Sequence, residues 1–418
     1  MNTESRNRSN LRRSAPILTA LLLVALNLRL GVTSASALLT ALTETGALTA
    51  ATVVLVPAIP TAVFAVAGIG TARFARRLGA DRVVLAGLVV LTIGLAIRAI
   101  PQPWVVVVGT VIATGGLAVV NILLPAVVRA HFGQRIGPVT TAYTTVMSIG
   151  AATAAATAVP LAHLAGSPSL GLALWAVPAV IAVVAWAVAI RGTGRALETG
   201  TISAVDGVAG DAAGPRAAAQ VSAQAPARSP LPAGTGLLAA YFAFQALLSY
   251  VAMGWLPTIA ADAGIPEARS GMLLGITMAV GIPATVLVVP LARGIGKMRV
   301  GFTLVAVASV AGISGMLLAP AALPELWAAL IGVGMCAFPL VLALITGFGA
   351  DAAESARVSA LVQSVGYSIA TLGPLGAGAI RQATGSWSAV LIALLFAVVV
   401  QGALGILLTR VLQRRRQA

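Results

Sequence analysis

The sequence predicts an all-α membrane protein with twelve transmembrane helices in two six-helix bundles. Hydrophobic residues make up 59% of the 418-residue chain, only 9% of its residues are charged, and the mean hydropathy is +1.00. Apolar windows of the roughly 20 residues that a helix needs to cross a bilayer recur along the chain, six before a polar break and six after it. Each window is expected to be a helix, because exposed strands cannot satisfy their backbone hydrogen bonds in lipid.

The windows are separated by glycine, proline and charge clusters. In the first half they cover Ala15–Leu38, Ala50–Thr71, Val83–Ile100, Trp104–Val128, Pro138–Leu164 and Leu170–Ile190. In the second half they cover Thr235–Thr258, Ser270–Leu291, Val300–Leu318, Leu326–Phe348, Ser355–Ile380 and Trp387–Thr409. The basic N-terminus is similar to the start of a signal peptide, but the apolar run after it is too long, so we expect a retained first span.

A polar segment divides the chain into two domains. Residues 192–232 are Ala, Gly, Ser and Pro with scattered charge, too polar to span a bilayer or pack a core. We therefore expect a first bundle over residues 1–191, a flexible cytoplasmic linker over 192–232 and a second bundle over 233–418.

The distribution of basic residues predicts the orientation. If the windows alternate across the membrane, 22 of the 26 Lys and Arg residues fall on the side that holds both termini, and Arg98, Arg269 and Arg381 fall on the other. Lys and Arg accumulate in cytoplasmic loops, so we expect a cytoplasmic-membrane protein with both termini in the cytoplasm. This placement explains the net charge of +15 without a nucleic-acid partner. We expect a monomer whose partners are the lipid bilayer and a small solute.

The two halves are similar in sequence. LLTALTETGALTAATVVLVPAIP from Leu38 aligns with LPTIAADAGIPEARSGMLLGITM from Leu256, which places Gly46 on Gly264. Two parallel repeats of six helices, related by an axis along the membrane normal, are the layout of major facilitator transporters.

Five segments are distributed over both halves of the chain outside the linker. They are ALNLRLGVTSASALL, NILLPAVVRAHFGQRIGPVTTAYTTVMSIGAA, GWLPTIAADAGI, GIPATVLVVPLA and QSVGYSIATLGPLGAGAIRQATGSW. Together they resemble the cyanate permease and 2-nitroimidazole transporter family within the major facilitator superfamily. The resemblance implies a rocker-type transporter that moves a small polar or anionic solute through a central site between the bundles.

The loop between the second and third windows keeps part of the superfamily signature Gly-x-x-x-Asp-Arg-x-Gly-Arg-Arg. In GIGTARFARRLGADR, Arg76 occupies the place of the aspartate, and Asp81 follows instead. The residues expected to form this gating loop are Arg73, Arg76, Arg77, Gly79 and Asp81.

Arg29 is the only basic residue assigned to the membrane interior. It lies about 14 residues, or roughly 21 Å of helix, past the start of its window. Such an arginine costs from about 2.5 to more than 10 kcal/mol and usually faces a cavity or a partner. Since a guanidinium can hold a planar anion through two hydrogen bonds, we expect Arg29 to bind solute, with a structural tie to helix carbonyls as the alternative. Asn27 points about 200° away around the helix, so both cannot face the cavity equally.

Other polar side chains lie at depths that reach a central cavity. Asn121 is either a solute ligand or a hydrogen-bonding partner of an adjacent helix. Gln363 and Tyr367 share a helix face and have the same two alternatives. The complete set expected at the solute site is Arg29, Asn27, Asn121, Tyr143, Tyr241, Gln245, Gln363 and Tyr367.

Some residues are expected to have structural roles. Tyr250 and Trp255 are interpreted as aromatics of the membrane interface. His131 and His163 are interpreted as structural or solvated, because they lack the spacing of a metal pair. The single cysteine, Cys336, excludes an intramolecular disulfide or a cysteine-based metal cluster.

All eleven Asp and Glu residues map to loops or helix ends. Proton-driven antiporters of cations need a buried acid, so we favour a neutral or anionic solute, with a proton as a candidate coupling ion and facilitated diffusion open. Efflux of a drug or toxic compound is the alternative function. An intramembrane enzyme is disfavoured, because a nucleophile with a base, or a metal with its ligands, is not found in the windows. We expect neither a metal nor a cofactor.

Overall fold

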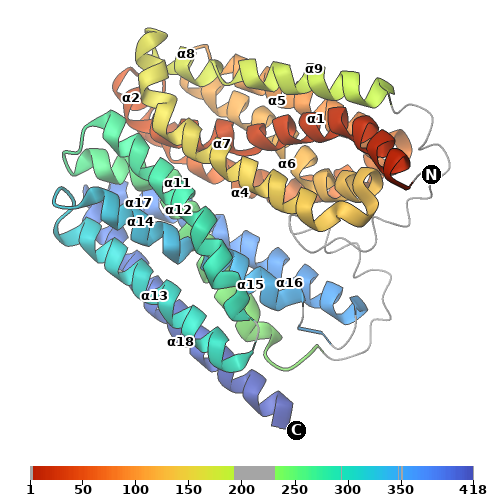
Figure 1. Ribbon diagram of the computed structural model, residues 1–418. Coiled ribbons are helices and arrows are strands. Elements are labelled where there is room, and N and C mark those ends of the chain that lie inside the picture. The colour runs from red at the N-terminus through yellow and green to blue at the C-terminus, as the bar shows by residue number, and fades with distance from the viewer. Residues whose placement is uncertain (1–2, 193–230, 293, 347, 350–351, 418) are drawn as a thin grey trace.

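The computed structural model describes residues 3–192, 231–292, 294–346, 348–349 and 352–417, and its regular secondary structure in these ranges is entirely helical (Figure 1). The helices of the first half are α1 (Thr3–Ala37), α2 (Leu39–Glu44), α3 (Ala50–Val53), α4 (Leu55–Leu78), α5 (Ala80–Ile97), α6 (Pro103–Phe132), η1 (Gly133–Arg135), α7 (Ile136–Leu164), α8 (Pro168–Ala173) and α9 (Ala176–Gly192). Those of the second half are α11 (Thr235–Asp262), α12 (Glu267–Val288), η3 (Val289–Ala292), α13 (Ile295–Leu318), α14 (Pro324–Met335), α15 (Ala337–Thr346), α16 (Ala352–Ala370), α17 (Leu372–Thr384) and α18 (Trp387–Gln417). The predicted all-α class is confirmed. The expected linker lies almost entirely outside the described residues.

Eleven stretches of the described chain are long and apolar enough to cross a membrane. The second of the twelve expected windows falls on α3 and α4, where the apolar part found, Ala50–Phe64, is shorter. Large apolar side chains such as Val286, Leu287 and Phe396 are also at least 70% exposed, which suits a lipid-facing surface. The protein is therefore a multi-pass membrane protein.

Four of the expected membrane windows contain two consecutive α-helices. The breaks fall between α3 and α4, α8 and α9, α14 and α15, and α16 and α17. In each case the third residue of the second helix is a proline: Pro57, Pro178, Pro339 and Pro374. Proline lacks a backbone N–H and crowds the carbonyl four residues earlier, so it fits the first turn of a helix and interrupts the preceding one.

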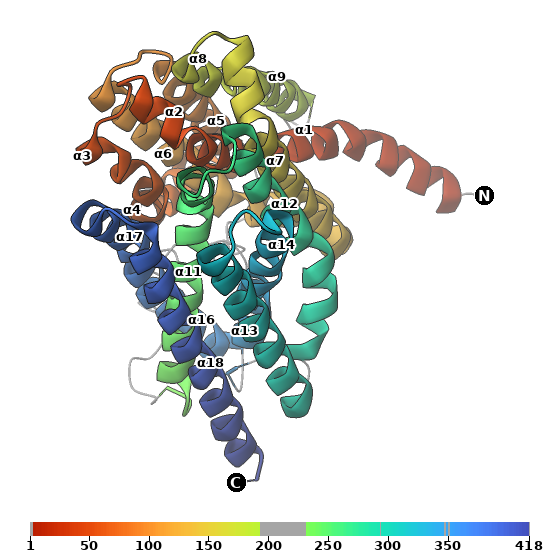
Figure 2. The ribbon, with the colours of Figure 1, turned by 90° about the vertical axis from the view of Figure 1, so that its left-hand side faces the viewer.

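Each half has an apolar core cluster of its own, and a third cluster contains residues of both halves. In the first half, α1 packs against α7 and α9, and α5 against α6. In the second half, α11 packs against α16 and α18, and α13 against α14 and α18. Between the halves, α7 contacts α12, while α11 contacts α1 and α4 (Figure 2). The α11 helix therefore connects the core of its own bundle to the interface with the other.

The two bundles touch at the end of the molecule opposite the chain termini and diverge toward the termini (Figure 1). At the touching end, Gly254 of α11 lies against Pro57 of α4, where an added Cβ would come within 2.7 Å of the proline Cβ. Gly271 of α12 similarly lies against the Ala155 carbonyl of α7, at 2.8 Å from an added Cβ. Only glycine allows these helices to approach so closely.

Hydrogen bonds between the halves reinforce the same end. The Ala41 backbone N–H of α2 donates to Glu267 Oε1 of α12 at 3.2 Å. The Gln382 side chain of α17 donates to the Ala50 carbonyl of α3. These bonds close the molecule on the side away from the termini.

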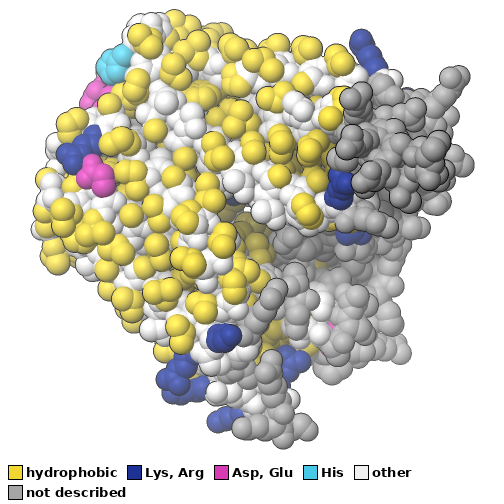
Figure 3. Space-filling view, viewed as in Figure 1, with side chains coloured by type: hydrophobic (Ala, Val, Ile, Leu, Met, Phe, Trp, Pro, Cys, Tyr) yellow, Lys and Arg dark blue, Asp and Glu magenta, His cyan; other side chains and the backbone are white. Residues whose placement is uncertain are grey.

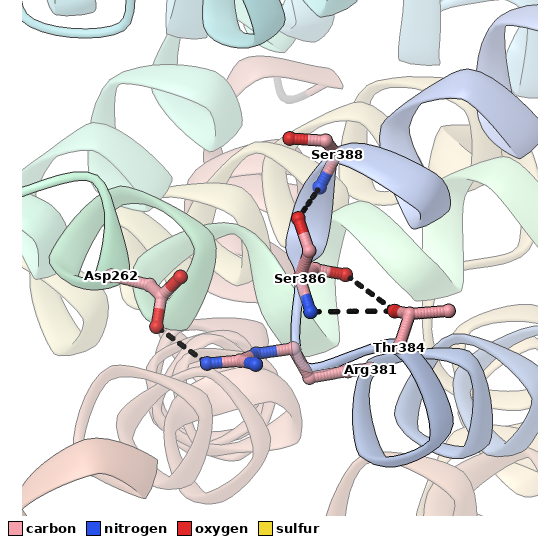
Figure 4. Close-up of polar contacts among 5 residues, drawn as sticks. All are labelled: Asp262, Arg381, Thr384, Ser386 and Ser388. Atoms are coloured by element: carbon pink, nitrogen blue, oxygen red, sulfur yellow. Dashed lines mark hydrogen bonds and ion pairs between the residues drawn. The ribbon is translucent and has the colours of Figure 1, made fainter.

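Polar contacts at this end also order the second bundle (Figure 4). Arg381 Nη2 of α17 donates to Asp262 Oδ1 at the end of α11, at 2.7 Å. Beyond α17, the Ser386 N–H donates to Thr384 Oγ1 at 3.3 Å, and the Ser388 N–H donates to Ser386 Oγ at 3.1 Å. The ion pair and these turn bonds hold α11, α17 and α18 together.

The glycines aligned in the two repeats adopt the same conformation. Gly46 follows the end of α2 with φ of 75°, and Gly264 follows the end of α11 with φ of 83°. Positive φ is the left-handed region that glycine enters without strain. Helices α2 and α11 therefore end in the same way.

Charge is concentrated at the two ends of the molecule (Figure 3). In that view Lys and Arg side chains gather mainly toward the end that carries the termini, and the surface between the ends is predominantly hydrophobic. This surface is expected to face the hydrocarbon core of a bilayer.

Candidate functional site

A cavity of about 760 Å³, part of it open to solvent, lies between the two bundles. Helices α1, α4, α6 and α7 line it from the first half, and α11, α15 and α16 from the second. Its polar and large side chains are Arg29, Phe64, Asn121, Met147, Tyr250, Met253, Phe338 and Tyr367. A ligand in this cavity would contact both bundles.

Arg29 supplies the charge of this cavity. Its guanidinium is half-buried, and its one hydrogen bond to the described residues goes from Nη1 to Met253 Sδ at 3.3 Å. A thioether is a weak acceptor. No Asp or Glu is among the described residues that line the cavity. The positive charge of Arg29 is therefore not balanced by a neighbouring side chain.

Two tyrosines face the same cavity from the second bundle. Tyr250 and Tyr367 both line it, and their rings meet edge to face with centroids 6.4 Å apart. Phe338 lies 6.3 Å from Tyr367. The prediction that Tyr250 lies in the membrane interface is wrong, because α11 turns it inward beside Met253. Trp255 was placed at the interface too, but it is 3% exposed and donates from Nε1 to the Pro374 carbonyl at 3.0 Å.

Asn121 of α6 joins Arg29 and the tyrosines in the cavity lining. Its amide carries both donors and an acceptor, which suits a polar solute. Arg29, Asn121 and Tyr367 are thus the members of the expected set that the structure brings together.

Asn27 does not line the cavity. It is 2% exposed, and its Nδ2 donates to the Leu23 carbonyl at 2.8 Å and to the Pro178 carbonyl of α9 at 3.1 Å. The helical spacing that separates Asn27 from Arg29 explains this arrangement. Asn27 binds a neighbouring helix within the first bundle.

The remaining expected site residues are buried in the bundles. Tyr143 is 3% exposed in the core of the first bundle, and Tyr241 is 1% exposed with its ring 4.7 Å from that of Phe302. Gln363 is 1% exposed and donates from Nε2 to Ser359 Oγ at 2.7 Å. These residues lie outside the lining of the central cavity in this conformation.

Gln245 belongs to an amide network inside the second bundle. Its Nε2 donates to Ser249 Oγ at 3.0 Å, and its Oε1 accepts from Nε2 of Gln401 on α18. A separate cavity of about 500 Å³ lies beside Gln245, between α11, α13, α14 and α18. The sequence interpretation missed Gln401, although a glutamine within the last apolar window was a signal that could have found it.

The expected gating loop lies at the junction of α4 and α5. Gly79 makes this turn with φ of 84°. Asp81 accepts from His131 Nε2 at 3.1 Å, and its backbone carbonyl accepts from Trp186 Nε1 at 3.0 Å. Arg73 and Arg77 are exposed, and the side chain of Arg76 lies outside the described residues. The described bonds stay within the first bundle, so a gating role for this loop remains a prediction.

The described residues contain no group of three or more His, Cys, Asp or Glu that could hold a metal ion. The candidate site therefore consists of one guanidinium, two phenols and one amide within apolar walls. Such a set can bind a small anion or polar molecule through hydrogen bonds.

Known proteins resemble this chain over nearly its whole length. A family model described as Major Facilitator Superfamily matches residues 21–374. The chain is 30% identical over 382 residues to the 2-nitroimidazole transporter of Escherichia coli (strain K12), covering 89% of this chain and 90% of that protein. It is 26% identical over 392 residues to the uncharacterized transporter YycB of Bacillus subtilis (strain 168), covering 93% and 92%. It is 25% identical over 373 residues to the cyanate transport protein CynX of Escherichia coli (strain K12), covering 89% and 91%.

Solved structures share the fold. A bacterial homolog of the human lysosomal transporter Spinster, in an inward-facing and unoccupied conformation, gives a TM-score of 0.75 at 15% identity, covering 96% of this chain and 98% of that one. The nucleoside transporter NupG gives a TM-score of 0.70 at 14% identity, covering 94% and 99%. The family model, the relatives and the paired helical bundles agree: this chain belongs to the Major Facilitator Superfamily and is related to its 2-nitroimidazole and cyanate transporters.

Proposed function

We propose that this protein is a secondary transporter that carries a small polar or anionic solute across the cytoplasmic membrane by alternating access. The observation that supports this most directly is Arg29, a guanidinium without a carboxylate partner in a cavity shared by both bundles. Asn121, Tyr250 and Tyr367 provide further hydrogen-bonding groups around it. In this proposal the chain acts as a transporter and not as an enzyme.

The arrangement of the bundles supports alternating access. They touch at the end away from the termini, through glycine contacts and the Ala41 to Glu267 hydrogen bond, and diverge toward the termini. We assign this arrangement to the state that is open toward the cytoplasm. Rocking the bundles about the central cavity would expose Arg29 to the other side.

The distribution of Lys and Arg supports a cytoplasmic location for both termini. We further propose that the protein works as a monomer. A proton is a candidate coupling ion. Since the cavity lining has no described carboxylate to carry the proton, it would travel on the solute.

The names of the relatives suggest which solutes to test first. Proteoliposome uptake should be measured with labelled cyanate, small carboxylates and 2-nitroimidazole. We expect Arg29→Gln to lower the affinity for the identified solute at least tenfold, since hydrogen bonds to charged groups contribute about 1.5–3 kcal/mol. Arg29→Lys should restore only part of it, because an ammonium cannot replace the planar guanidinium.

Arg269→Gln is the matched control, because Arg269 is an exposed arginine paired with Glu325 at the closed end. It should transport like the wild type. If folded Arg29→Gln protein transported the solute with unchanged affinity, the proposed central site would be wrong. Uptake that ignores an imposed pH gradient would exclude proton symport.

A second candidate function is efflux of a toxic compound. It is favoured by the 30% identity to the 2-nitroimidazole transporter. Deleting the gene should then raise the cellular accumulation of labelled 2-nitroimidazole, and expressing it should lower the accumulation again. Lower accumulation in the deletion strain would indicate uptake instead.

A further inference from the structure

Arg98 is a second arginine in the interior of the molecule. The sequence interpretation placed it on the outer side, but at the end of α5 it is 1% exposed. Its aliphatic stem passes Gly109 of α6, where an added Cβ would come within 2.8 Å of Arg98 Cγ. The first bundle is therefore built to enclose this side chain.

Most of the Arg98 guanidinium has no partner. Nη1 donates to the Gly31 carbonyl of α1 at 3.0 Å. Nε and Nη2 are buried without a hydrogen-bond partner in the described part of the chain. A buried donor or charge that lacks a partner is destabilising, because it has lost its interactions with water. The bond to Gly31 therefore leaves the N–H groups of Nε and Nη2 without an acceptor among the described residues.

Arg98 also lines a narrow cavity between α1, α4, α5, α6 and α11, whose empty space of about 440 Å³ includes space open to solvent. Thr110 and Thr114 also line it, but their hydroxyls donate to the carbonyls of Val106 and Thr110 in their own helix, at 2.7 and 2.6 Å. No Asp or Glu is among the described lining residues. Arg98 is therefore the charged residue among the described residues that line this cavity.

The Arg98 cavity adjoins the Arg29 cavity on the side of the closed end. Residues that line both are Val32, Pro60, Leu117, Tyr250 and Met253. The two cavities therefore share part of their walls.

We propose that the Arg98 cavity is a binding site for a small monovalent anion, separate from the Arg29 site. Such an anion accepts from Nε and Nη2 and neutralises the buried charge. Charge-assisted bonds of this kind are short and strong. The anion is either an inorganic ion such as chloride or a small carboxylate such as formate, and the experiment distinguishes these sources. The proposal concerns binding, so it stands independently of which solute is transported.

The test is the thermal stability of purified protein at constant ionic strength, with gluconate replaced stepwise by chloride or by formate. Arg29→Gln serves as the background, so that the central site does not contribute. In this background we expect at least one of the two small anions to raise the melting temperature in a saturable way. Adding Arg98→Gln should weaken the apparent affinity at least tenfold. Arg381 is an arginine paired with Asp262 near the protein surface at the same end. Adding Arg381→Gln instead should leave the apparent anion affinity unchanged.

The direction of the change in melting temperature distinguishes an anion-binding role of Arg98 from a purely structural one. In gluconate alone, Arg98→Gln should melt no lower than its parent, because it removes an unpaired buried charge. If Arg98→Gln melts lower by the same amount at every anion concentration, Arg98 is only a tie between α5 and α1. If the Arg98→Gln variant does not fold, the Arg29→Gln protein alone still tests the proposal. Equal melting temperatures of that protein in gluconate, chloride and formate would overturn it. A response to chloride alone would identify a resident inorganic anion.

Discussion

At the scale of single residues, the phenol groups of Tyr250 and Tyr367 complete the polar surface around Arg29. Both rings come from the second bundle, whereas Arg29 and Asn121 come from the first. A solute held by this set would connect the two bundles. The loss of solute affinity when each hydroxyl is removed therefore measures how much the second bundle contributes to binding.

Tyr250→Phe and Tyr367→Phe should each raise the KM for the transported solute by about two- to tenfold. One hydrogen bond contributes about 0.5–1.5 kcal/mol, and phenylalanine keeps the ring packing. Uptake kinetics in proteoliposomes provide the measurement. Tyr241→Phe is the control, because Tyr241 lies against Phe302 outside the cavity. A KM that stays at the wild-type value in both cavity variants would remove the tyrosines from the site.

Asn27→Ala should lower the melting temperature without changing the KM by more than about twofold. The substitution removes two hydrogen bonds, to the carbonyls of Leu23 and Pro178, and such bonds contribute about 1 kcal/mol each. The two readouts are the melting temperature of purified protein and uptake kinetics. A KM increase as large as that of Arg29→Gln at an unchanged melting temperature would return Asn27 to the solute site.

These side chains show why sequence alone predicted only part of the site. Arg29 and Asn121 were chosen by their depth in apolar windows, which can be counted along a helix, and both line the cavity. Depth does not give the direction in which a side chain points, and Tyr250, Tyr241 and Gln245 occupy one helix but face different surroundings. Arg98 was missed for a related reason: a charge at a window end was assumed to reach solvent.

At the scale of helices, the contact between α11 and α4 joins the two bundles at the end away from the termini. The helices approach closely because Gly254 has no side chain to meet Pro57. Sequence predicted nearly all the membrane helices, since apolar length determines them. It did not predict which glycines lie at contacts between the bundles, because that depends on how the two bundles are placed against each other.

Gly254→Val should shift the population away from the state in which the two bundles touch at the end opposite the termini. Inserting side-chain atoms into a packed contact costs about 1–3 kcal/mol, which changes a two-state population at least about fivefold. In a Cys336→Ser background, a Ser36→Cys reporter beside the Arg98 cavity should react faster with a methanethiosulfonate reagent. Gly236→Val is the control, because Gly236 lies on the same helix with nothing within 4 Å of an added Cβ. Equal labelling rates in the two variants would contradict this role for the Gly254 contact.

At the scale of the whole molecule, the two bundles enclose the central cavity between them. The division into two domains with a linker stays a prediction from the polar break and the repeated glycines in the sequence. The relative tilt of the bundles could not be predicted from the sequence, because the same packing surfaces serve more than one state of a transporter.

The orientation in the membrane can be tested with two further cysteines in the Cys336→Ser background. Glu325→Cys is at the end opposite the termini, and Arg410→Cys is near the C-terminus; the native side chains of both are exposed. An impermeant thiol reagent added to intact cells should label the first and leave the second unlabelled until the cells are opened. The reverse pattern would place the termini outside the cytoplasm.

The absence of a described carboxylate around Arg29 also has an electrical consequence. A monovalent anion that crosses without a proton carries net charge through the membrane potential, which is worth about 2.3 kcal/mol per charge for each 100 mV. With a negative cell interior, this voltage opposes entry of the anion and favours its exit. For an anionic solute at this site, the voltage would thus promote export, and uptake would require the solute to bring its own proton or a steep inward gradient.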